Sequence, residues 1–131
     1  MDQANIVILA AGHGKRMGAD VPKPLVTLHG KPLVQYVYDA VMTTQVCDRP
    51  ILVVSPDNHD LFHAQFGERC LYALQDKQLG TGHAVMAACD QLDRGLPTLV
   101  LYGDQPTVTS EMITDMVSAH QQNNSVFTMA T

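Results

Sequence analysis

A glycine-rich stretch near the N-terminus combines residue types that could bind a phosphate chain. An apolar run at residues 6–11 leads into Gly12 and Gly14, and the cations Arg16 and Lys23 follow. Glycines let a backbone come close to a ligand, so that its N–H groups can bind phosphate oxygens. The Arg16 guanidinium could bind two oxygens at once, and Lys23 would act as a point charge. These residue types in this order predict an anion-binding loop directly after a buried strand.

The spacing of this loop differs from two common phosphate-binding patterns. The dinucleotide-binding pattern G-x-G-x-x-G needs its third glycine at the position of Met17, and the P-loop needs its second glycine there. Two prolines behind the glycines also exclude a helix that starts directly after them. We therefore expect the N–H groups of residues 11–14 and the side chains of Arg16 and Lys23 to hold the phosphates.

Apolar segments that alternate with helical patterns predict the fold class. We expect strands at residues 5–10, 50–55, 70–74, 97–102 and 125–130. Helices are expected from Lys31 onward, over 57–66 with Asp57 as its cap, over 81–92, and from Ser110, which would cap the last one. This order predicts a single α/β domain over residues 1–131, Rossmann-like, with a mainly parallel sheet covered by helices on both faces.

Inward-facing positions follow from the helical spacing of apolar residues. In the first helix these are Leu33, Val37, Ala40 and Val41, and in the last they are Ile113, Met116 and Val117. The helix expected at 81–92 would bury Ala84, Val85, Ala88, Cys89 and Leu92.

Polar segments follow three of the expected strands. They are residues 12–23, residues 75–82 and Asp104. Ligands of open parallel sheets bind at the carboxyl ends of the strands, so these segments predict a single site. Asp104 fits a metal ligand there, and it equally fits a turn residue within G-D-Q-P. Gln75 could likewise be a ligand-binding residue or an ordinary loop residue.

Two histidine features have local explanations as well. His59 and His63 have the i, i+4 spacing of a metal-binding helix, but the helix is short and polar and no third ligand is evident, so we interpret them as a solvated face. His83 begins a helix near the expected site, and either a ligand contact or a local structural role fits it.

Composition restricts the class of partner. The chain has 131 residues, a net charge of -5 and 46% hydrophobic residues, which predicts a globular domain rather than a nucleic-acid or membrane-surface binder. Residues 12–31 nevertheless hold four of the eight Lys and Arg residues, which favours a small anionic ligand. The three cysteines are widely spaced, which is typical of reduced thiols that pack as small apolar side chains. We therefore expect a cytoplasmic protein, and no apolar run is long enough to span a membrane.

Five segments together resemble the sugar-nucleotide nucleotidyltransferases. They are L-A-A-G-x-G-x-R-M-G at 9–18, P-K-P-L at 22–25, G-K-P-L at 30–33, L-Q-D-x-Q-L-G-T-G-H-A at 74–84 and L-Y-G-D-x-P at 101–106. Within that superfamily, the last two segments most resemble the N-acetylglucosamine-1-phosphate uridyltransferase domain of the bifunctional GlmU enzymes. The resemblance runs over essentially the whole chain and implies the nucleotide-diphospho-sugar transferase fold.

The resemblance implies an activity and a set of site residues. The activity would be transfer of UMP from UTP to N-acetylglucosamine 1-phosphate, giving UDP-N-acetylglucosamine and pyrophosphate. Arg16 and Lys23 would neutralise the triphosphate, with Arg16 stabilising the pyrophosphate leaving group, and Asp104 would bind Mg²⁺. The nucleotide would be lined by Leu9, Ala10, Ala11, Gly12 and Gly14. Gln75 and Gly80 would contact the uracil edge, and Thr81 and Gly82 would shape its pocket.

Two features of the chain keep alternatives open. The G-D-Q-P at 103–106 resembles the molybdenum-cofactor cytidylyltransferases, which rank second because they lack the G-T-G-H-A segment. The chain also ends near the fifth strand of the family, before most of the sugar pocket. We therefore expect a truncated chain, or a sheet completed by a partner such as a second copy. A non-catalytic nucleotide-binding module is the remaining alternative.

Overall fold

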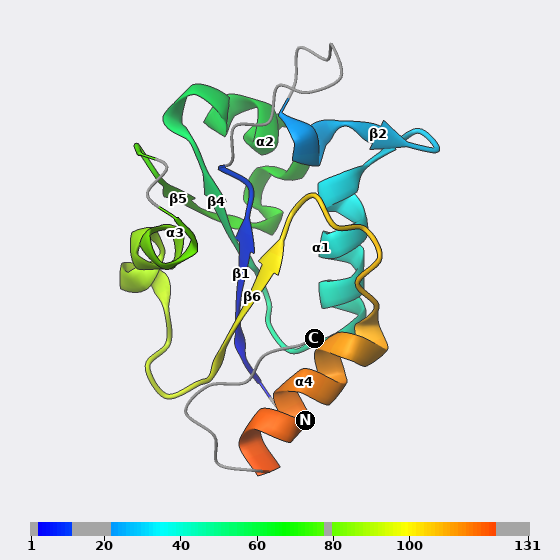
Figure 1. Ribbon diagram of the computed structural model, residues 1–131, viewed down its shortest axis with the longest axis vertical. Helices are drawn as coiled ribbons and strands as arrows, with labels where there is room; N and C mark the ends of the chain where they lie inside the picture. The colour runs from blue at the N-terminus through cyan, green and yellow to red at the C-terminus, as the bar shows by residue number, and fades with distance from the viewer. Residues whose placement is uncertain (1–2, 12–21, 78–79, 123–131) are drawn as a thin grey trace.

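Four parallel strands form the central sheet of the computed structural model, which describes residues 3–11, 22–77 and 80–122 (Figure 1). The sheet order is β5-β4-β1-β6, and every neighbouring pair is parallel. The strand bounds are β1 Asn5–Leu9, β4 Ile51–Val54, β5 Leu71–Leu74 and β6 Thr98–Tyr102. Four expected strands and the parallel sheet are thus confirmed. The strand expected at 125–130 lies outside the described residues.

The two central strands, β1 and β4, are buried on both faces, and their apolar residues do not alternate with polar ones. In β1, Ile6 and Ile8 contribute to one core, while Val7 contributes to the core on the opposite face. In β4 the same alternation assigns Leu52 and Val54 to the first core. A strand that is apolar at every position therefore needs helices on both sides of the sheet.

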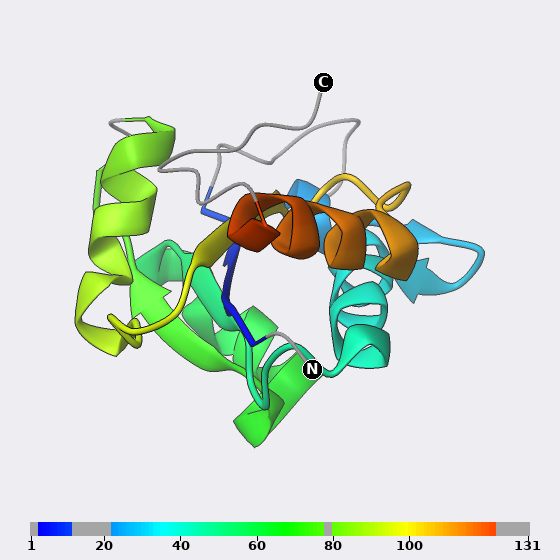
Figure 2. The ribbon, with the colours of Figure 1, turned by 90° about the horizontal axis from the view of Figure 1, so that it is seen from below.

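Helices cover both faces, as expected. The first face is covered by α1 Leu33–Thr44, α2 His59–Phe66 and α4 Ser110–Gln122, and the second by α3 Thr81–Ala87 (Figures 1 and 2). Phe62 and Phe66 of α2 are the largest fully buried side chains of the described residues. Burial of such a ring stabilises the fold by about 1.5–3 kcal/mol relative to leaving it exposed.

The segment expected to be a loop from 11 to 30 contains regular structure in its described part. A 3₁₀ turn, η1, spans Lys23–Leu25, and a hairpin pairs β2 Thr27–Leu28 with β3 Lys31–Pro32. The turn between the two strands has positive φ at both His29 and Gly30. Because Lys31–Pro32 forms β3, helix α1 begins at Leu33, and the expectation of a start at Lys31 was wrong.

The inward face of α1 is rotated from the expected one. Its buried residues are Val34, Val37, Tyr38 and Val41, whereas Leu33 and Ala40 are half-buried. The expected stripe of α4 is closer to the structure, with Ile113 and Val117 buried and Met116 half-buried.

Both expected helix caps were wrong. Asp57 lies within the 3₁₀ turn η2 Pro56–Asn58, and Asn58 takes the N-cap position of α2 without a side-chain bond. At α4 the N–H of Met112 donates to the Thr109 hydroxyl at 3.1 Å, so Thr109 caps the helix in place of Ser110. Adjacent Thr and Ser are equally good caps, and only the backbone path decides between them.

The third helix is shorter than the expected 81–92. It ends at Ala87 and a 3₁₀ turn, η4 Cys89–Gln91, follows. Ala84 and Ala88 are buried as expected, but Cys89 is exposed, because the tighter turn rotates it away from the core. None of the described helices is long and apolar enough to cross a membrane.

The three cysteines are in different environments and all are free. Burial raises the pKa of the Cys70 thiol to about 12. Burial, aided by the charge of Asp48, raises the pKa of Cys47 to about 11. A thiol whose pKa is raised in the folded state contributes stability to that state at pH values below the pKa of the unfolded chain. This contribution is lost as the pH rises through the folded-state pKa values, about 11 for Cys47 and about 12 for Cys70.

We expect one fast-reacting thiol in the native chain. At pH 8 the thiolate is the reacting form, so Ellman's reagent should modify Cys89 rapidly and leave Cys47 and Cys70 slow. Unfolding in guanidinium chloride should expose all three thiols, and Cys89→Ser should remove the fast phase. A second fast thiol in the native Cys89→Ser variant would contradict this assignment.

Candidate functional site

The carboxyl ends of the strands meet at one edge of the sheet. The chain leaves β1 at Leu9, β5 at Leu74 and β6 at Tyr102, all on the same side (Figure 1). After β1, the next two strands along the chain, β4 and β5, lie on one side of it, whereas β6 pairs with its other side. The strand order therefore reverses between β1 and β6, which is where open parallel sheets form a ligand crevice.

Gly103 fixes the chain at this reversal point. Its N–H donates to the Leu9 carbonyl at 2.9 Å, which continues the β1–β6 pairing by one residue. A Cβ on Gly103 would lie 3.1 Å from that same carbonyl oxygen, and it would also crowd Ile8 and Val34. This close approach favours glycine over any residue with a side chain, a reason for Gly103 that sequence reasoning did not find.

Lys23 and Asp104 come together across the crevice. The Lys23 ammonium lies 3.5 Å from a carboxylate oxygen of Asp104, and both side chains are partly exposed. Pro22 and Pro24, on either side of Lys23, are buried and hold the 3₁₀ turn against the core. An exposed pair of this kind stabilises a fold by only about 0–1 kcal/mol, so both groups can exchange partners for a charged ligand at low cost.

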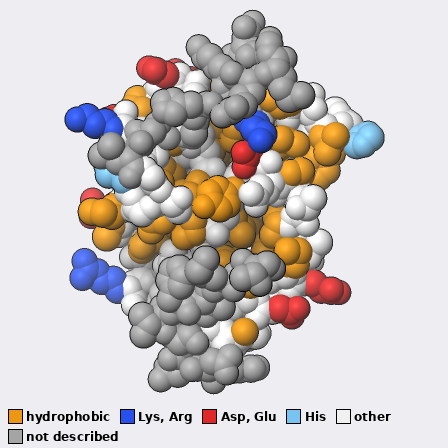
Figure 3. Space-filling model, in the orientation of Figure 1, with side chains coloured by type: hydrophobic (Ala, Val, Ile, Leu, Met, Phe, Trp, Pro, Cys, Tyr) orange, Lys and Arg blue, Asp and Glu red, His pale blue; other side chains and the backbone are white. Residues whose placement is uncertain are grey.

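Apolar side chains surround this part of the surface. Figure 3 shows hydrophobic side chains across the middle of the face that carries β6. Tyr102 at the end of β6 and Met112 of α4 are among the exposed large hydrophobic residues of the described chain. Within residues 3–11, 22–77 and 80–122, no three His, Cys, Asp or Glu side chains gather as a preformed metal centre.

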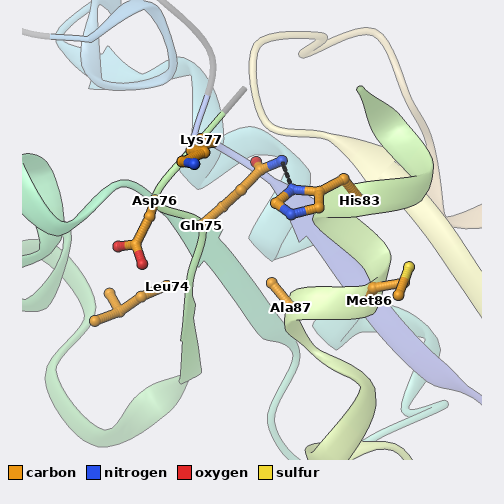
Figure 4. A pocket seen from close by; sticks show the side chains of 7 residues that line it. All are labelled: Leu74, Gln75, Asp76, Lys77, His83, Met86 and Ala87. Carbon is orange, nitrogen blue, oxygen red and sulfur yellow. Dashed lines mark hydrogen bonds between the residues drawn. The ribbon is translucent and has the colours of Figure 1, made fainter. Parts of the chain in front are cut away.

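A second part of the site lies between the end of β5 and α3. Gln75 is the buried polar side chain there, with 3% of its surface exposed, and its backbone N–H donates to the Val54 carbonyl at 2.9 Å. Its side-chain nitrogen Nε2 lies 3.0 Å from Nδ1 of His83 on α3 (Figure 4). The two residues line a pocket of about 350 Å³, together with Leu74, Asp76, Lys77, Met86 and Ala87.

Gly80 and Gly82 differ in what their backbone requires. Gly80 has φ +105° and ψ 176° at the N-cap of α3, a conformation that is essentially restricted to glycine. Its carbonyl accepts the N–H of Ala84 at 3.1 Å. Gly82 has no such constraint, and a Cβ there would meet no atom within 4 Å. Gly82 is exposed in the first turn of α3.

Thr81 joins the two parts of the edge. Its hydroxyl lies 3.3 Å from the hydroxyl of Tyr102, so the start of α3 is linked to the end of β6. This contact places the Gln75 pocket and the Lys23–Asp104 pair on one continuous edge. Sequence reasoning grouped these segments correctly by their positions after strands, but it did not find Tyr102.

Not every expected site residue has a free group at this edge. Ala10 and Ala11 are buried, and the Ala10 N–H is already bonded to the Val53 carbonyl at 2.8 Å. Leu9 is half-buried, and its carbonyl accepts the Gly103 N–H. The Ala10 N–H and the Leu9 carbonyl therefore already have backbone partners, while Gly12, Gly14 and Arg16 lie outside the described residues.

The curated proteins that this chain resembles include several with the same name. Bifunctional protein GlmU of Ralstonia pickettii is 48% identical over 115 residues, which cover 88% of this chain and 25% of that protein. Bifunctional protein GlmU of Brevibacillus brevis is 39% identical over 132 residues, which cover all of this chain and 28% of that protein. The chain thus spans about a quarter of the length of these relatives.

Solved structures share the fold at lower identity. 4-Diphosphocytidyl-2C-methyl-D-erythritol synthase from Anaerococcus prevotii superimposes with a TM-score of 0.72 at 19% identity, over 92% of this chain and 52% of that chain. CMP:2-keto-3-deoxy-manno-octonic acid synthetase in complex with CTP gives a TM-score of 0.71 at 21% identity, over 95% and 49%. The profile of the MobA-like NTP transferase domain matches residues 6–131. With that match and the identity to GlmU proteins, the chain belongs to the MobA-like NTP transferase domain family.

Proposed function

We propose that this chain is the nucleotide-binding part of a uridyltransferase that transfers UMP from UTP to N-acetylglucosamine 1-phosphate. The observation that carries this proposal is the meeting of Lys23 and Asp104 at the strand reversal point, a cation beside a carboxylate in the crevice where such sheets bind ligands. The GlmU relatives support the uridyltransferase reaction over the cytidylyltransferase alternative. The cytoplasmic location, and completion of the sheet by a partner, stay predictions.

The chemistry needs charge neutralisation more than covalent help. An oxygen of the sugar phosphate forms a bond to the α-phosphorus of UTP in line with the leaving group, and the bond to the bridging oxygen breaks, which releases pyrophosphate. Lys23 would leave Asp104 and bind the triphosphate, and Arg16 would stabilise the leaving pyrophosphate. Positioning and electrostatic stabilisation supply most of the acceleration in reactions of this kind.

Asp104 fits the role of a magnesium ligand by its chemistry and position. Its carboxylate is partly exposed at the end of β6 and has a single cation, Lys23, as its ion-pair partner among the described residues. Mg²⁺ takes few protein carboxylates and completes its shell with substrate phosphates and water, so a preformed cluster is not needed. When bound, the ion would neutralise charge on the phosphates beside the α-phosphorus.

The base would occupy the pocket at the end of β5. Gln75, which lines this pocket, and Gly80 would contact the uracil edge. Thr81 and Gly82, at the start of α3, would form the wall beside it. Ala11 would line the nucleotide through its backbone, because its side chain is buried.

Replacing Asp104 tests the magnesium assignment. Asp104→Ala should lower pyrophosphate release from UTP, Mg²⁺ and N-acetylglucosamine 1-phosphate by at least about 100-fold, the effect of losing one group that stabilises charge in the transition state. The melting temperature should change little, because the ion pair with Lys23 is exposed. Asp115→Ala, an exposed carboxylate on α4, is the matched control. Unchanged turnover in Asp104→Ala would remove the metal role, whereas UTP binding without turnover in the unaltered chain would favour a non-catalytic module.

Two lysines of neighbouring segments provide a paired test of phosphate binding. Lys23→Ala should raise the dissociation constant of UTP by about tenfold or more, because a charge-assisted hydrogen bond is lost. Lys31→Ala should leave it within about twofold, since Lys31 is paired with Asp39 and lies over the ring of Tyr36. Titration calorimetry measures both constants. Equal effects of the two substitutions would indicate general charge attraction rather than a site at Lys23.

The two glycines of α3 separate a backbone role from a ligand role. Gly80→Ala should lower the free energy of unfolding by about 1–3 kcal/mol, because its φ is unfavourable for a side chain. Gly82→Ala should keep or raise that free energy by about 0.5–1 kcal/mol, since alanine favours a helix. Urea unfolding measures both. If Gly82→Ala is stable and still binds UTP as tightly as the unaltered chain, Gly82 does not line the base pocket.

A further inference from the structure

The hydrogen bond between Gln75 and His83 holds a buried side-chain amide at the end of β5. Gln75 is nearly fully buried at the end of β5, whereas His83 extends from the first turn of α3 toward it (Figure 4). A buried amide without a partner would cost about 1–3 kcal/mol, so the His83 ring is what makes this position tenable for glutamine. His83 is therefore a partner of Gln75 rather than a solvated residue.

The direction of this hydrogen bond follows from the orientation of the Gln75 amide. In the orientation that the structure has, the amide nitrogen donates, Nδ1 of His83 accepts, and the neutral ring carries its proton on Nε2. This arrangement leaves Gln75 with its carbonyl oxygen and one further N–H for any ligand in the pocket. If Nδ1 carried a proton instead, the amide would have to turn over and present these two groups in the opposite order.

Uracil and cytosine present hydrogen-bond donors and acceptors in opposite order, and an amide in a fixed orientation can distinguish the two. Along the edge formed by ring positions 3 and 4, uracil offers an N–H donor and then a carbonyl acceptor, whereas cytosine offers an acceptor and then an amino donor. An amide held in one orientation pairs with one order and opposes the other. An amide free to turn over can pair with either.

We propose that His83 is a positioning residue that selects uracil over cytosine by holding the Gln75 amide in one orientation. The inference rests on the proposed function, because it takes the nucleotide base to lie in the pocket between β5 and α3. His83 need not touch the nucleotide: it acts through Gln75. The selectivity of the site for its base is then set by the unprotonated Nδ1 of one ring.

The test compares two nucleotides in two variants of His83. The dissociation constants of UTP and CTP, each with Mg²⁺, are measured by calorimetry, and their ratio is the readout. His83→Ala should reduce the preference for UTP about tenfold, which corresponds to the 1.4 kcal/mol of about one neutral hydrogen bond. His83→Asp places an acceptor-only oxygen near the same point, so it should retain the preference although its charge weakens binding of both triphosphates.

His63→Ala is the matched control, because it removes an exposed imidazole on α2 that does not line the pocket. It should leave the ratio unchanged. A general destabilisation of α3 would weaken the binding of UTP and CTP alike, so it would not change the ratio of their dissociation constants. Nitrogen NMR of the free protein at pH 8 should show the His83 proton on Nε2, with Nδ1 unprotonated, which is a readout independent of nucleotide binding.

The outcomes distinguish the inference from the function on which it rests. If the unaltered chain binds neither UTP nor CTP, the proposed function fails and the inference fails with it. If the chain binds UTP selectively and His83→Ala keeps the full preference, only the inference is overturned. A proton on Nδ1 in the free protein, or a loss of preference in His83→Asp equal to that in His83→Ala, also overturns it.

Discussion

The pairing of β1 with β6 is the interaction on which the rest of the site depends. The two strands run parallel from Asn5 beside Thr98 to Leu9 beside Tyr102, and the Gly103 N–H then bonds to the Leu9 carbonyl. This register determines where Asp104 leaves the sheet. Glycine at 103 favours this register, since a Cβ would lie 3.1 Å from the carbonyl oxygen that the N–H reaches. A shift of one residue would invert every side chain of β6 between the two cores.

The edge above these strands has two parts with different chemistry. Beside β1 and β6, Lys23 and Asp104 form a charged, partly exposed region that suits phosphates and a metal ion. Beside β5 and α3, Gln75 and His83 provide an amide and an imidazole that suit the polar edge of a base. The contact between Thr81 and Tyr102 joins them. Such a division matches a ligand that is anionic at one end and aromatic at the other, as a nucleoside triphosphate is.

Sequence reasoning predicted the elements more reliably than their ends. Apolar, β-branched runs gave four strands close to their observed bounds, because such runs favour a strand wherever they are buried. The errors fall at helix starts and ends: Asp57 and Ser110 were chosen as caps, and Cys89 was assigned to the core. Each of these depends on where the backbone turns within one or two residues, and neighbouring candidates of similar propensity compete at each point. The hairpin of β2 and β3 was missed because two-residue strands carry almost no periodic signal.

The sequence by itself determined the alternation of strands and helices, the parallel sheet, and the grouping of Gln75 and Asp104 at one edge, because these follow from local hydrophobic patterns and the order of elements. Only the tertiary structure decided which atoms face each other there. The preference for glycine at 103 arises from a carbonyl 94 residues earlier in the chain, and the partner of Gln75 lies on a different element. Distances between side chains of separate elements depend on register and packing, and a pattern along the chain contains neither of them.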